Sequence, residues 1–371
     1  MAVNRRNVLV FVILVIAGMI GVALYAAHTV SRSTWAAPAP GRVAPLASLP
    51  PDRAHILFRI TALDETHGRV GLRFPDDPEG TVFASPMACD RMHVAGERGI
   101  CLSARRGVVT TYRALLFDRN FQVLHTLPLA GAPSRARMSP DGRLAAVTVF
   151  VTGHSYASAN FSTRTSVIDV ASGTWVVADM ENLEVQRGGA PFKAIDFNFW
   201  GVTFSKNGQR LYATLNTGGK SLLVQGEPGS PLLKVVHDDV ECPSLSPDNR
   251  RIGFKRRIPG SQAGRFTWQL NVLELATGKV TALATEGRNV DDQVEWLNDH
   301  ELLYALPESP DQVGAASNVW ALPIDGKATP RLLLPLASSP AVVRAPGRSY
   351  LSARNPPHDK RSLMGVKPQS P

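Results

Sequence analysis

The chain has few cysteines, and none of them lies in a metal-binding pattern. Only Cys89, Cys101 and Cys242 occur among 371 residues, with no C-x-x-C motif and no pair of histidines at a ligand spacing. We therefore expect no metal site and no cofactor, because structural zinc sites need closely spaced Cys and His ligands. Cys89 and Cys101 lie twelve residues apart in one predicted hairpin. Two interpretations stay open for them, a local disulfide or two small buried thiols.

The sequence also lacks a basic stripe of the kind that binds nucleic acid. The net charge is +9, but the arginines are scattered over predicted loops and have no aromatic residues between them. Nucleic-acid binding is therefore not expected. Affinity for an anionic envelope surface, or solubility, explains the charge better.

A single long apolar run opens the chain. Residues 8–27, VLVFVILVIAGMIGVALYAA, carry no charge and as a helix would span ~30 Å of hydrocarbon. The apolar core of a secretory signal is shorter, at about 7–15 residues. Arg5 and Arg6 favour a cytoplasmic N-terminus. We expect residues 1–30 to be a cytoplasmic stub and a single-pass plasma-membrane anchor, with the rest extracytoplasmic; cleavage near Ala37-Pro38-Ala39 stays open.

The middle of the chain repeats itself. Four stretches align, 135–150, 201–216, 242–257 and 293–308, and each has two alternating apolar strands around an Asp or Asn turn. A second hairpin follows each of them, at 165–177, 221–236, 270–283 and 317–334. Weaker copies lie at 90–127 and 55–74. The Ala- and Pro-rich residues 31–52 are predicted to be a linker, and 355–371 a disordered tail.

Four strands in about 40–50 residues is the size of one propeller blade. The prediction is an all-β fold, a six-bladed β-propeller over residues 53–354, with five to seven blades as the range and an N-terminal transmembrane helix. Residues 340–353 are expected to return beside the first blade, because an open ring would expose strand edges.

The repeats carry a resemblance to a known family. The stretches PSRARMSPDGR, NFSTRTSVIDVASG, NFWGVTFSKNG and VECPSLSPDN, within residues 85–335, resemble the propeller repeats of TolB-like proteins, especially the membrane-anchored ones of actinobacteria. The resemblance implies the fold and only weakly a function. TolB carries a folded α/β domain before its propeller, for which the stretch after Val30 leaves no room. Partnership with outer-membrane lipoproteins is therefore not expected by default.

The stretch GHSYA, residues 153–157, imitates the serine elbow of hydrolases. That elbow needs a helix after the strand, whereas another predicted strand follows here. Ser155 is therefore not predicted to be catalytic, and Gly153 is expected to let the chain leave its strand. The loop from His154 to Arg164 is expected to account for the long interval before the next repeat, and to be the first place to look for a partner's footprint.

Polar and aromatic residues of two neighbouring repeats are the candidate binding residues. They could line a groove or the mouth of the axial channel; they are His154, Tyr156, Asn160, Asp196, Asn198 and Trp200, with Asp292 from a later repeat. The alternative is that the aromatic members only fill the space between blades. Acidic residues at 238–241 and 290–293 suit a cation, but capping of turns or pairing with arginines is preferred, so no metal is predicted.

The predicted function is a non-catalytic, membrane-tethered propeller that binds a protein or peptide of the cell envelope. It is not predicted to be an enzyme. The alternative is an envelope hydrolase acting on glycan, with Asp196 and Asp292 as a carboxylate pair across the channel, which requires a separation of about 5–9.5 Å. A sensor ectodomain is a third class.

Overall fold

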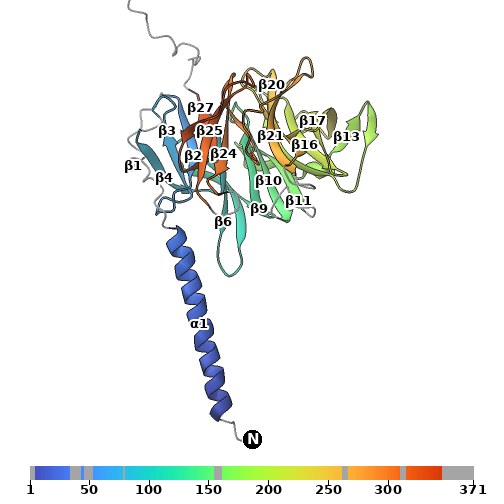
Figure 1. Cartoon of the computed structure of the whole chain (residues 1–371). Helices are drawn as coiled ribbons and strands as arrows, with labels where there is room; N and C mark the ends of the chain where they lie inside the picture. The colour runs from blue at the N-terminus through green and yellow to red at the C-terminus, as the bar shows by residue number, and fades with distance from the viewer. Residues whose placement is uncertain are drawn as a thin grey trace, which may run out of the picture.

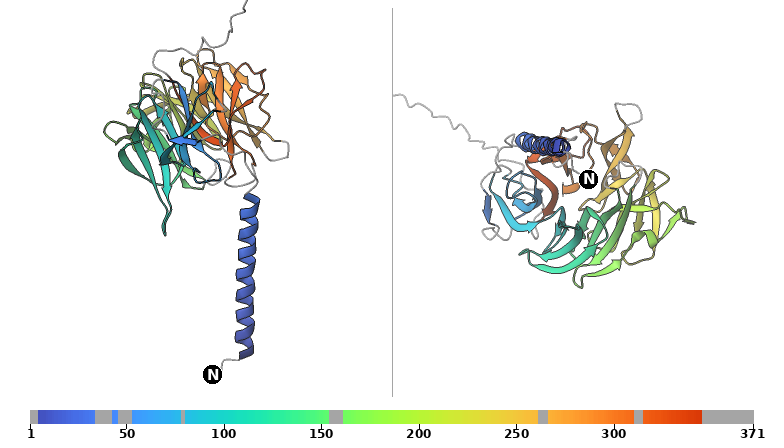
Figure 2. Two further views of the ribbon diagram at one scale, coloured as in Figure 1. Left: turned by 90° about the vertical axis from the view of Figure 1, so that its left-hand side faces the viewer. Right: turned by 90° about the horizontal axis from the view of Figure 1, so that it is seen from below.

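Six β-sheets form a ring around a central axis (Figures 1 and 2). The computed structural model describes residues 5–33, 43–45, 53–77, 80–153, 161–260, 266–309 and 315–344. Within them each sheet is one blade, and the hairpins fall where the repeats predict them. The all-β, six-bladed propeller is confirmed.

The blades are numbered here in chain order. Blade 1 has β2 (His55–Ile60), β3 (Arg69–Arg73), β4 (Val82–Ala88), β27 (Ala337–Val343) and an outer β1 (Val43–Pro45); blade 2 has β5 (Arg91–Ala95), β6 (Arg98–Arg105), β7 (Thr111–Asp118) and β8 (Val123–Leu129); blade 3 has β9 (Ala132–Met138), β10 (Leu144–Thr152), β11 (Ser162–Asp169) and β12 (Thr174–Val177). Blade 4 has β15 (Asn198–Phe204), β16 (Leu211–Thr217), β17 (Lys220–Gly226) and β18 (Leu232–Asp238); blade 5 has β19 (Glu241–Leu245), β20 (Arg251–Pro259), β21 (Phe266–Glu274) and β22 (Val280–Ala282); blade 6 has β23 (Glu295–Asn298), β24 (Glu301–Pro307), β25 (Ser317–Pro323) and β26 (Arg331–Leu334).

The C-terminal strand closes the ring. β27 pairs antiparallel with β2, with Val342 opposite Ile56 and Ala341 opposite Leu57, and it is the innermost strand of blade 1. The predicted return of residues 340–353 is confirmed as far as 344, the last residue that the structure describes. Residues 345–354 of the predicted propeller and the tail lie outside the described residues. Within the predicted linker, β1 pairs in parallel with β4.

The alternation of apolar side chains supplies both faces of every blade. On β2, Ile56 and Phe58 pack against blade 6, whereas Leu57 packs against blade 2. On β24, Leu303 faces blade 1 and Tyr304 faces blade 5. Because the side-chain period of a strand is two, one buried cluster forms between each pair of neighbouring blades. At about 1.5–3 kcal/mol per large buried side chain, these clusters are the main stabilising term.

A serine hydroxyl holds the first turn of three blades. In blade 3, Ser139 Oγ donates to Asp141 Oδ1 at 2.6 Å and accepts from the Leu144 N–H at 2.9 Å. Ser205 and Ser246 make the equivalent pairs of bonds in blades 4 and 5. The S-x-D/N motif is therefore a hydrogen-bonding unit that fixes the turn between the first and second strands.

These turns also contact one another around the ring. Arg143 Nη2 donates to Asn207 O at 3.2 Å, the Lys206 N–H to Asn249 Oδ1 at 3.0 Å, and the Asp248 N–H to Asp299 Oδ1 at 3.0 Å. The turns of blades 3, 4, 5 and 6 are thereby linked in sequence. Since a turn that contacts its neighbours moves less than an isolated loop, this face of the propeller is held rigid.

An extra hairpin widens blade 4. After the short helix η2 (Met180–Asn182), β13 (Glu184–Arg187) and β14 (Ala190–Phe192) form a hairpin, and β13 pairs in parallel with the outer strand β18 (Figure 1). This insertion, within residues 178–197, explains most of the long interval between Ser139 and Ser205. The predicted loop after β10 is therefore not the main source of that length. Gly153, which follows β10, has a positive φ of 70°, which agrees with its predicted role in letting the chain leave the strand.

Cys89 and Cys101 form a disulfide, with their Cα atoms 5.4 Å apart. Cys89 lies between β4 and β5, and Cys101 lies on β6. Both are buried in the cluster between blades 1 and 2. Of the two interpretations that the sequence left open, the structure adopts the disulfide, which joins the first two blades; Cys242 is a buried free thiol.

The N-terminal helix α1 (Arg5–Ser33) projects from the propeller (Figures 1 and 2). Its exposed apolar side chains include Leu9, Phe11, Leu14 and Leu24. Among the described residues, no helix has both the length and the hydropathy expected of a membrane-spanning segment. The transmembrane part of the predicted architecture is not confirmed.

Replacing Gly208 by alanine tests the contact between turns. Gly208 has a φ of +67°, and an added Cβ would lie 2.7 Å from Asp141 Oδ2 in the neighbouring blade. The Asp141 carboxylate is held by Ser139 and Arg143, so it cannot easily move. We expect Gly208→Ala to lower the free energy of unfolding by about 2 kcal/mol in urea denaturation.

Gly219→Ala is the matched control. Gly219 has a φ of +73° in the same blade, but an added Cβ would meet nothing within 4 Å. It should show only the backbone cost of about 1 kcal/mol. Equal losses in the two variants would contradict a role for the contact between blades.

Candidate functional site

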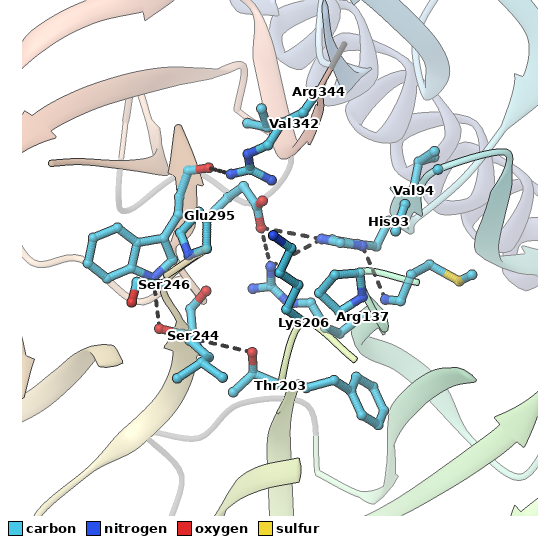
Figure 3. Close-up of a pocket in the computed structure, with 18 of the residues that line it drawn as sticks. His93, Val94, Arg137, Thr203, Lys206, Ser244, Ser246, Glu295, Val342 and Arg344 are labelled. Carbon is cyan, nitrogen blue, oxygen red and sulfur yellow. Dashed lines mark hydrogen bonds and ion pairs between the residues drawn. The ribbon is translucent and has the colours of Figure 1, made fainter. Parts of the chain in front are cut away.

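A cavity of about 390 Å³ lies on the propeller axis, at the end where the inner strands finish. All six blades line it, through residues such as His93, Arg137, Thr203, Ser244, Glu295 and Val342 on β5, β9, β15, β19, β23 and β27 (Figure 3). The linked turns after these strands, including Pro140 and Pro247, form its rim. The cavity is therefore the mouth of the axial channel.

His93 is held in one tautomer inside this cavity. The backbone N–H of Met138 donates to Nδ1 at 3.1 Å, so Nδ1 carries no proton and Nε2–H points to Glu295 Oε2, 3.3 Å away (Figure 3). Burial and the neighbouring charge of Arg137 lower the pKa of His93. The imidazole is thus a neutral donor at pH 7.

Glu295 and Arg137 form a buried ion pair across the axis. Arg137 Nη1 donates to Glu295 Oε2, and Nη2 donates to the carbonyl oxygen of Val294 at 2.9 Å. The two side chains are only 10% and 9% exposed. Burial alone would raise the pKa of Glu295, but Arg137 and the hydrogen bond from His93 lower it to about 2. Glu295 is therefore ionised and serves as the counter-ion of Arg137.

The lining of the cavity carries more positive than negative charge. Its cations are Arg137, Lys206 and Arg344, and its one carboxylate is Glu295. Arg344 Nη2 donates to the carbonyl oxygen of Trp296 at 2.7 Å. Lys206 is exposed at the end of β15. With three cations and one anion, the mouth has an excess of two positive charges and attracts anions.

A second layer of charges lies deeper in the channel. Lys255 Nζ of blade 5 pairs with Asp291 Oδ1, and Arg135 Nη2 of blade 3 lies 3.8 Å from the same oxygen. The side chain of Asp291 keeps 37% of its accessible surface. Nearby cations outweigh burial and lower its pKa. Gln293 spans the space between the layers by donating to the Val202 and Pro243 carbonyl oxygens.

The strand period explains both layers. Arg135 and Arg137 are two residues apart on β9, as are Arg91 and His93 on β5. Residues i and i+2 lie on one face of a strand, so each pair places one side chain in each layer. The acidic residues 291 and 295 supply the counter-ions from blade 6.

The four described members of the predicted site lie outside this cavity. Asp196 accepts from Thr217 Oγ1 and the Gly218 N–H at 2.5 and 2.6 Å, which caps the turn after β16. Asn198 Oδ1 accepts from the Thr163 N–H at 2.9 Å. Trp200 is fully buried beside Phe150, Phe161 and Cys242, as the packing alternative predicts. Asp292 accepts from the Ala305 N–H at 2.9 Å.

His154, Tyr156 and Asn160 lie outside the described residues, as does Ser155. The binding role predicted for these residues stays a prediction.

In the acidic stretches 238–241 and 290–293, carboxylates pair with basic side chains, in line with the structural role preferred over cation binding. Asp238 pairs with Arg187, Glu241 with Arg257, and Asp291 with Lys255. Within the described residues, no cluster of three or more His, Cys, Asp or Glu could hold a metal ion.

The residues of the channel mouth were missed by sequence reasoning, although a signal was present. Arg135 and Arg137 alternate with Ser134, Ala136 and Met138 on the first strand of a repeat, where an apolar face is expected. Charged residues at two-residue spacing on an innermost strand indicate a polar channel. Glu295 carries the same signal on β23, the innermost strand of blade 6, but its pairing with Arg137, 158 residues away, has no local pattern.

The described lining of the cavity contains hydroxyl groups and one histidine, which are not hydrogen-bonded to one another. Ser246 Oγ donates to Asp248 and holds a turn. The ring nitrogens of His93 contact Met138, Glu295 and Arg137, and no lining hydroxyl is hydrogen-bonded to them. A nucleophile needs such a base, so the described lining has no activated nucleophile.

Comparison with known proteins supports the fold. No family model matches the chain, and no curated protein matches it. Among solved structures, it is similar to TolB from Acinetobacter baumannii, with a TM-score of 0.52 and 16% identity, covering 78% of this chain and 66% of that protein. A structure of putative TolB from Agrobacterium tumefaciens matches at a TM-score of 0.45 and 12% identity, covering 76% and 88%.

A chain of a nidogen/laminin complex is also similar, with a TM-score of 0.50 and 11% identity, covering 78% of this chain and 98% of that one. The chain thus spans about two thirds of the Acinetobacter TolB. The TolB-like propeller fold inferred from the repeats is confirmed, and at these identities the likeness shows the fold alone.

The variant Glu295→Gln tests the buried ion pair between Glu295 and Arg137. We expect it to lower the free energy of unfolding by about 3 kcal/mol, because Arg137 would be left as an uncompensated buried charge. The carboxylate has a pKa of about 2 when folded, against about 4.3 when unfolded. Its stabilising contribution is therefore present above pH ~4.3 and is lost as the pH falls toward 2.

Urea denaturation of the wild type and of Glu295→Gln between pH 7 and pH 3 measures the contribution of the Glu295 carboxylate to stability. The wild type should lose stability more steeply below pH 5 than Glu295→Gln. The control is Glu301→Gln, whose carboxylate lies 3.0 Å from Arg331 at the surface and should cost under about 1 kcal/mol. Similar costs and pH slopes for the two variants would be evidence against the pair.

Proposed function

We propose that this chain is a non-catalytic protein-binding propeller, and that the channel mouth with its rim of linked turns is its recognition surface. The observation that carries the proposal is the cavity of about 390 Å³ to which all six blades contribute. A site built by every blade is pre-organised, so little conformational entropy is lost when a partner binds. Exposed turns on a rigid scaffold are a common place for recognition.

The similar structures are compatible with this role. One of them is part of a complex between nidogen and laminin, so a propeller of this shape has been found in a protein assembly. The TolB structures add the same fold. Their partners are not transferred to this chain, whose own channel residues define what it binds.

The hydrolase alternative is not favoured. Its carboxylate pair, Asp196 and Asp292, would have to face a shared substrate. Instead, each accepts a hydrogen bond from a nearby backbone N–H group, Gly218 and Ala305 respectively, and neither lines the cavity. Both therefore have a structural role in the fold.

We further propose that α1 tethers the propeller to the plasma membrane, with the propeller on the extracytoplasmic side and its partner in the envelope. Exposed apolar side chains on α1, such as Phe11 and Leu14, support the tether. The Cys89–Cys101 disulfide supports an oxidising compartment.

A photo-cross-linking amino acid at Pro140 tests the recognition surface. Pro140 is exposed on the rim of the cavity, so irradiation of cells that express this variant should yield one reproducible cross-linked protein. The control places the same group at Lys327, which is exposed in a turn between outer strands. Recovery of the same proteins at both positions, or of none, would refute the proposal.

Protease accessibility tests the tether and its orientation. Protease added to intact spheroplasts should digest the propeller, and deletion of residues 8–27 should remove the chain from the membrane fraction. A propeller that is protected in intact spheroplasts, or one that stays with membranes after the deletion, would show that the tether is wrong.

A further inference from the structure

We propose that the axial cavity binds an extended acidic segment of the partner, whose carboxylates contact Lys206, Arg344 and Arg137. This inference rests on the proposed function and adds the chemistry of the bound segment. It follows from the charges, the hydrogen bonds left unmade and the size of the cavity.

The lining of the cavity has an excess of positive charge. The one carboxylate of the lining, Glu295, is already bonded to Arg137 and His93, and it offsets only one of three cations. Burial and Arg137 keep His93 neutral, so it adds no charge. Lys206 and Arg344 remain as two positive charges that the lining does not neutralise.

Arg137 retains hydrogen-bonding capacity inside the cavity. Its side chain is 10% exposed, and its Nε–H is buried without a hydrogen-bond partner among the described residues. A buried donor that makes no bond is costly. A carboxylate that reaches the channel mouth would lie near this guanidinium group, which lines the cavity, and would be attracted by its charge even though the buried Nε–H itself is out of reach.

The acidic residues of the rim do not cancel this field. Asp141 is bonded to Ser139 and to Arg143, whose Nε lies 2.8 Å from Asp141 Oδ2. Asp248 likewise pairs with Arg251 at 2.7 Å. Asp141 and Asp248 thus each have their own cation outside the cavity.

The deeper layer adds to the attraction. Lys255, Arg135 and Arg257 lie near two carboxylates, those of Asp291 and Glu241, so this layer also has more cations than anions. Walls of low dielectric constant concentrate such a field along the channel. An anion is therefore attracted along the axis and not only at the rim.

The size of the cavity selects an extended segment. At about 390 Å³ it lies near the lower end of the range of small-ligand sites, about 300–1,000 Å³. It can take a few side chains but no folded domain. A free small carboxylate would offer the same chemistry, so the experiment includes one.

Binding of a fluorescein-labelled Asp-Glu-Asp-Glu peptide, measured by fluorescence anisotropy at low salt, tests the inference. We expect it to bind at least about tenfold more tightly than the uncharged Asn-Gln-Asn-Gln peptide, because charge-assisted hydrogen bonds are the stronger ones. The affinity should fall as NaCl is raised. The double variant Lys206→Gln/Arg344→Gln should bind the acidic peptide about tenfold more weakly.

The matched control is Lys279→Gln/Lys327→Gln, which removes the same charge from two exposed turns outside the cavity. It should leave the affinity unchanged. Equal binding of the two peptides, or equal loss in the two double variants, would overturn the inference. Binding of citrate without binding of the acidic peptide would show that the ligand is a small carboxylate, which also overturns it.

The two experiments distinguish failure of the acidic-segment inference from failure of the proposed protein-binding function. If Pro140 cross-links to a partner through a segment without acidic residues, the protein-binding role holds and this inference fails. If the acidic peptide binds but no partner is captured at the rim, the proposed function fails instead.

Discussion

Closure of the ring is the constraint on which the rest of this structure depends. β27 has to reach β2 across nearly the whole described propeller before blade 1 has its innermost strand. Without that strand, Ile56 and Phe58 would lose part of the apolar cluster that joins blades 1 and 6, and a strand edge would be exposed. The pairing also places Val342 and Arg344 beside the channel mouth. The same strand therefore closes the ring and completes the lining of the cavity.

Charged side chains meet inside the ring, where the six inner strands converge. Arg137 and Glu295 meet across it from blades 3 and 6, with His93 from blade 2. A buried ion pair contributes little net stability compared with an apolar core, but losing one partner is costly.

Much of the fold follows from local patterns. Two-residue alternation and Asp or Asn turns suffice to locate the hairpins, because both are short-range properties of a strand and its turn. The extra hairpin β13–β14 was missed, since its strands of four and three residues are too short to show alternation. The predicted residues Asp196 and Asn198 are polar for a local reason, which is to bond Thr217, Gly218 and Thr163. A polar residue in a predicted loop can cap a turn or contact a ligand, and the sequence alone does not show which of the two it does.

The sequence by itself determined the blades and the turn units, and their number only to within five to seven, because each blade is encoded within about 50 residues by alternation and by turn residues such as Ser139. It did not determine which residues share the channel. The bond from Arg137 to Glu295 joins residues 158 positions apart, and the disulfide partners were only one of two open interpretations. Only the tertiary structure decided these contacts, because the order in which blades face one another across the axis is a property of the closed ring.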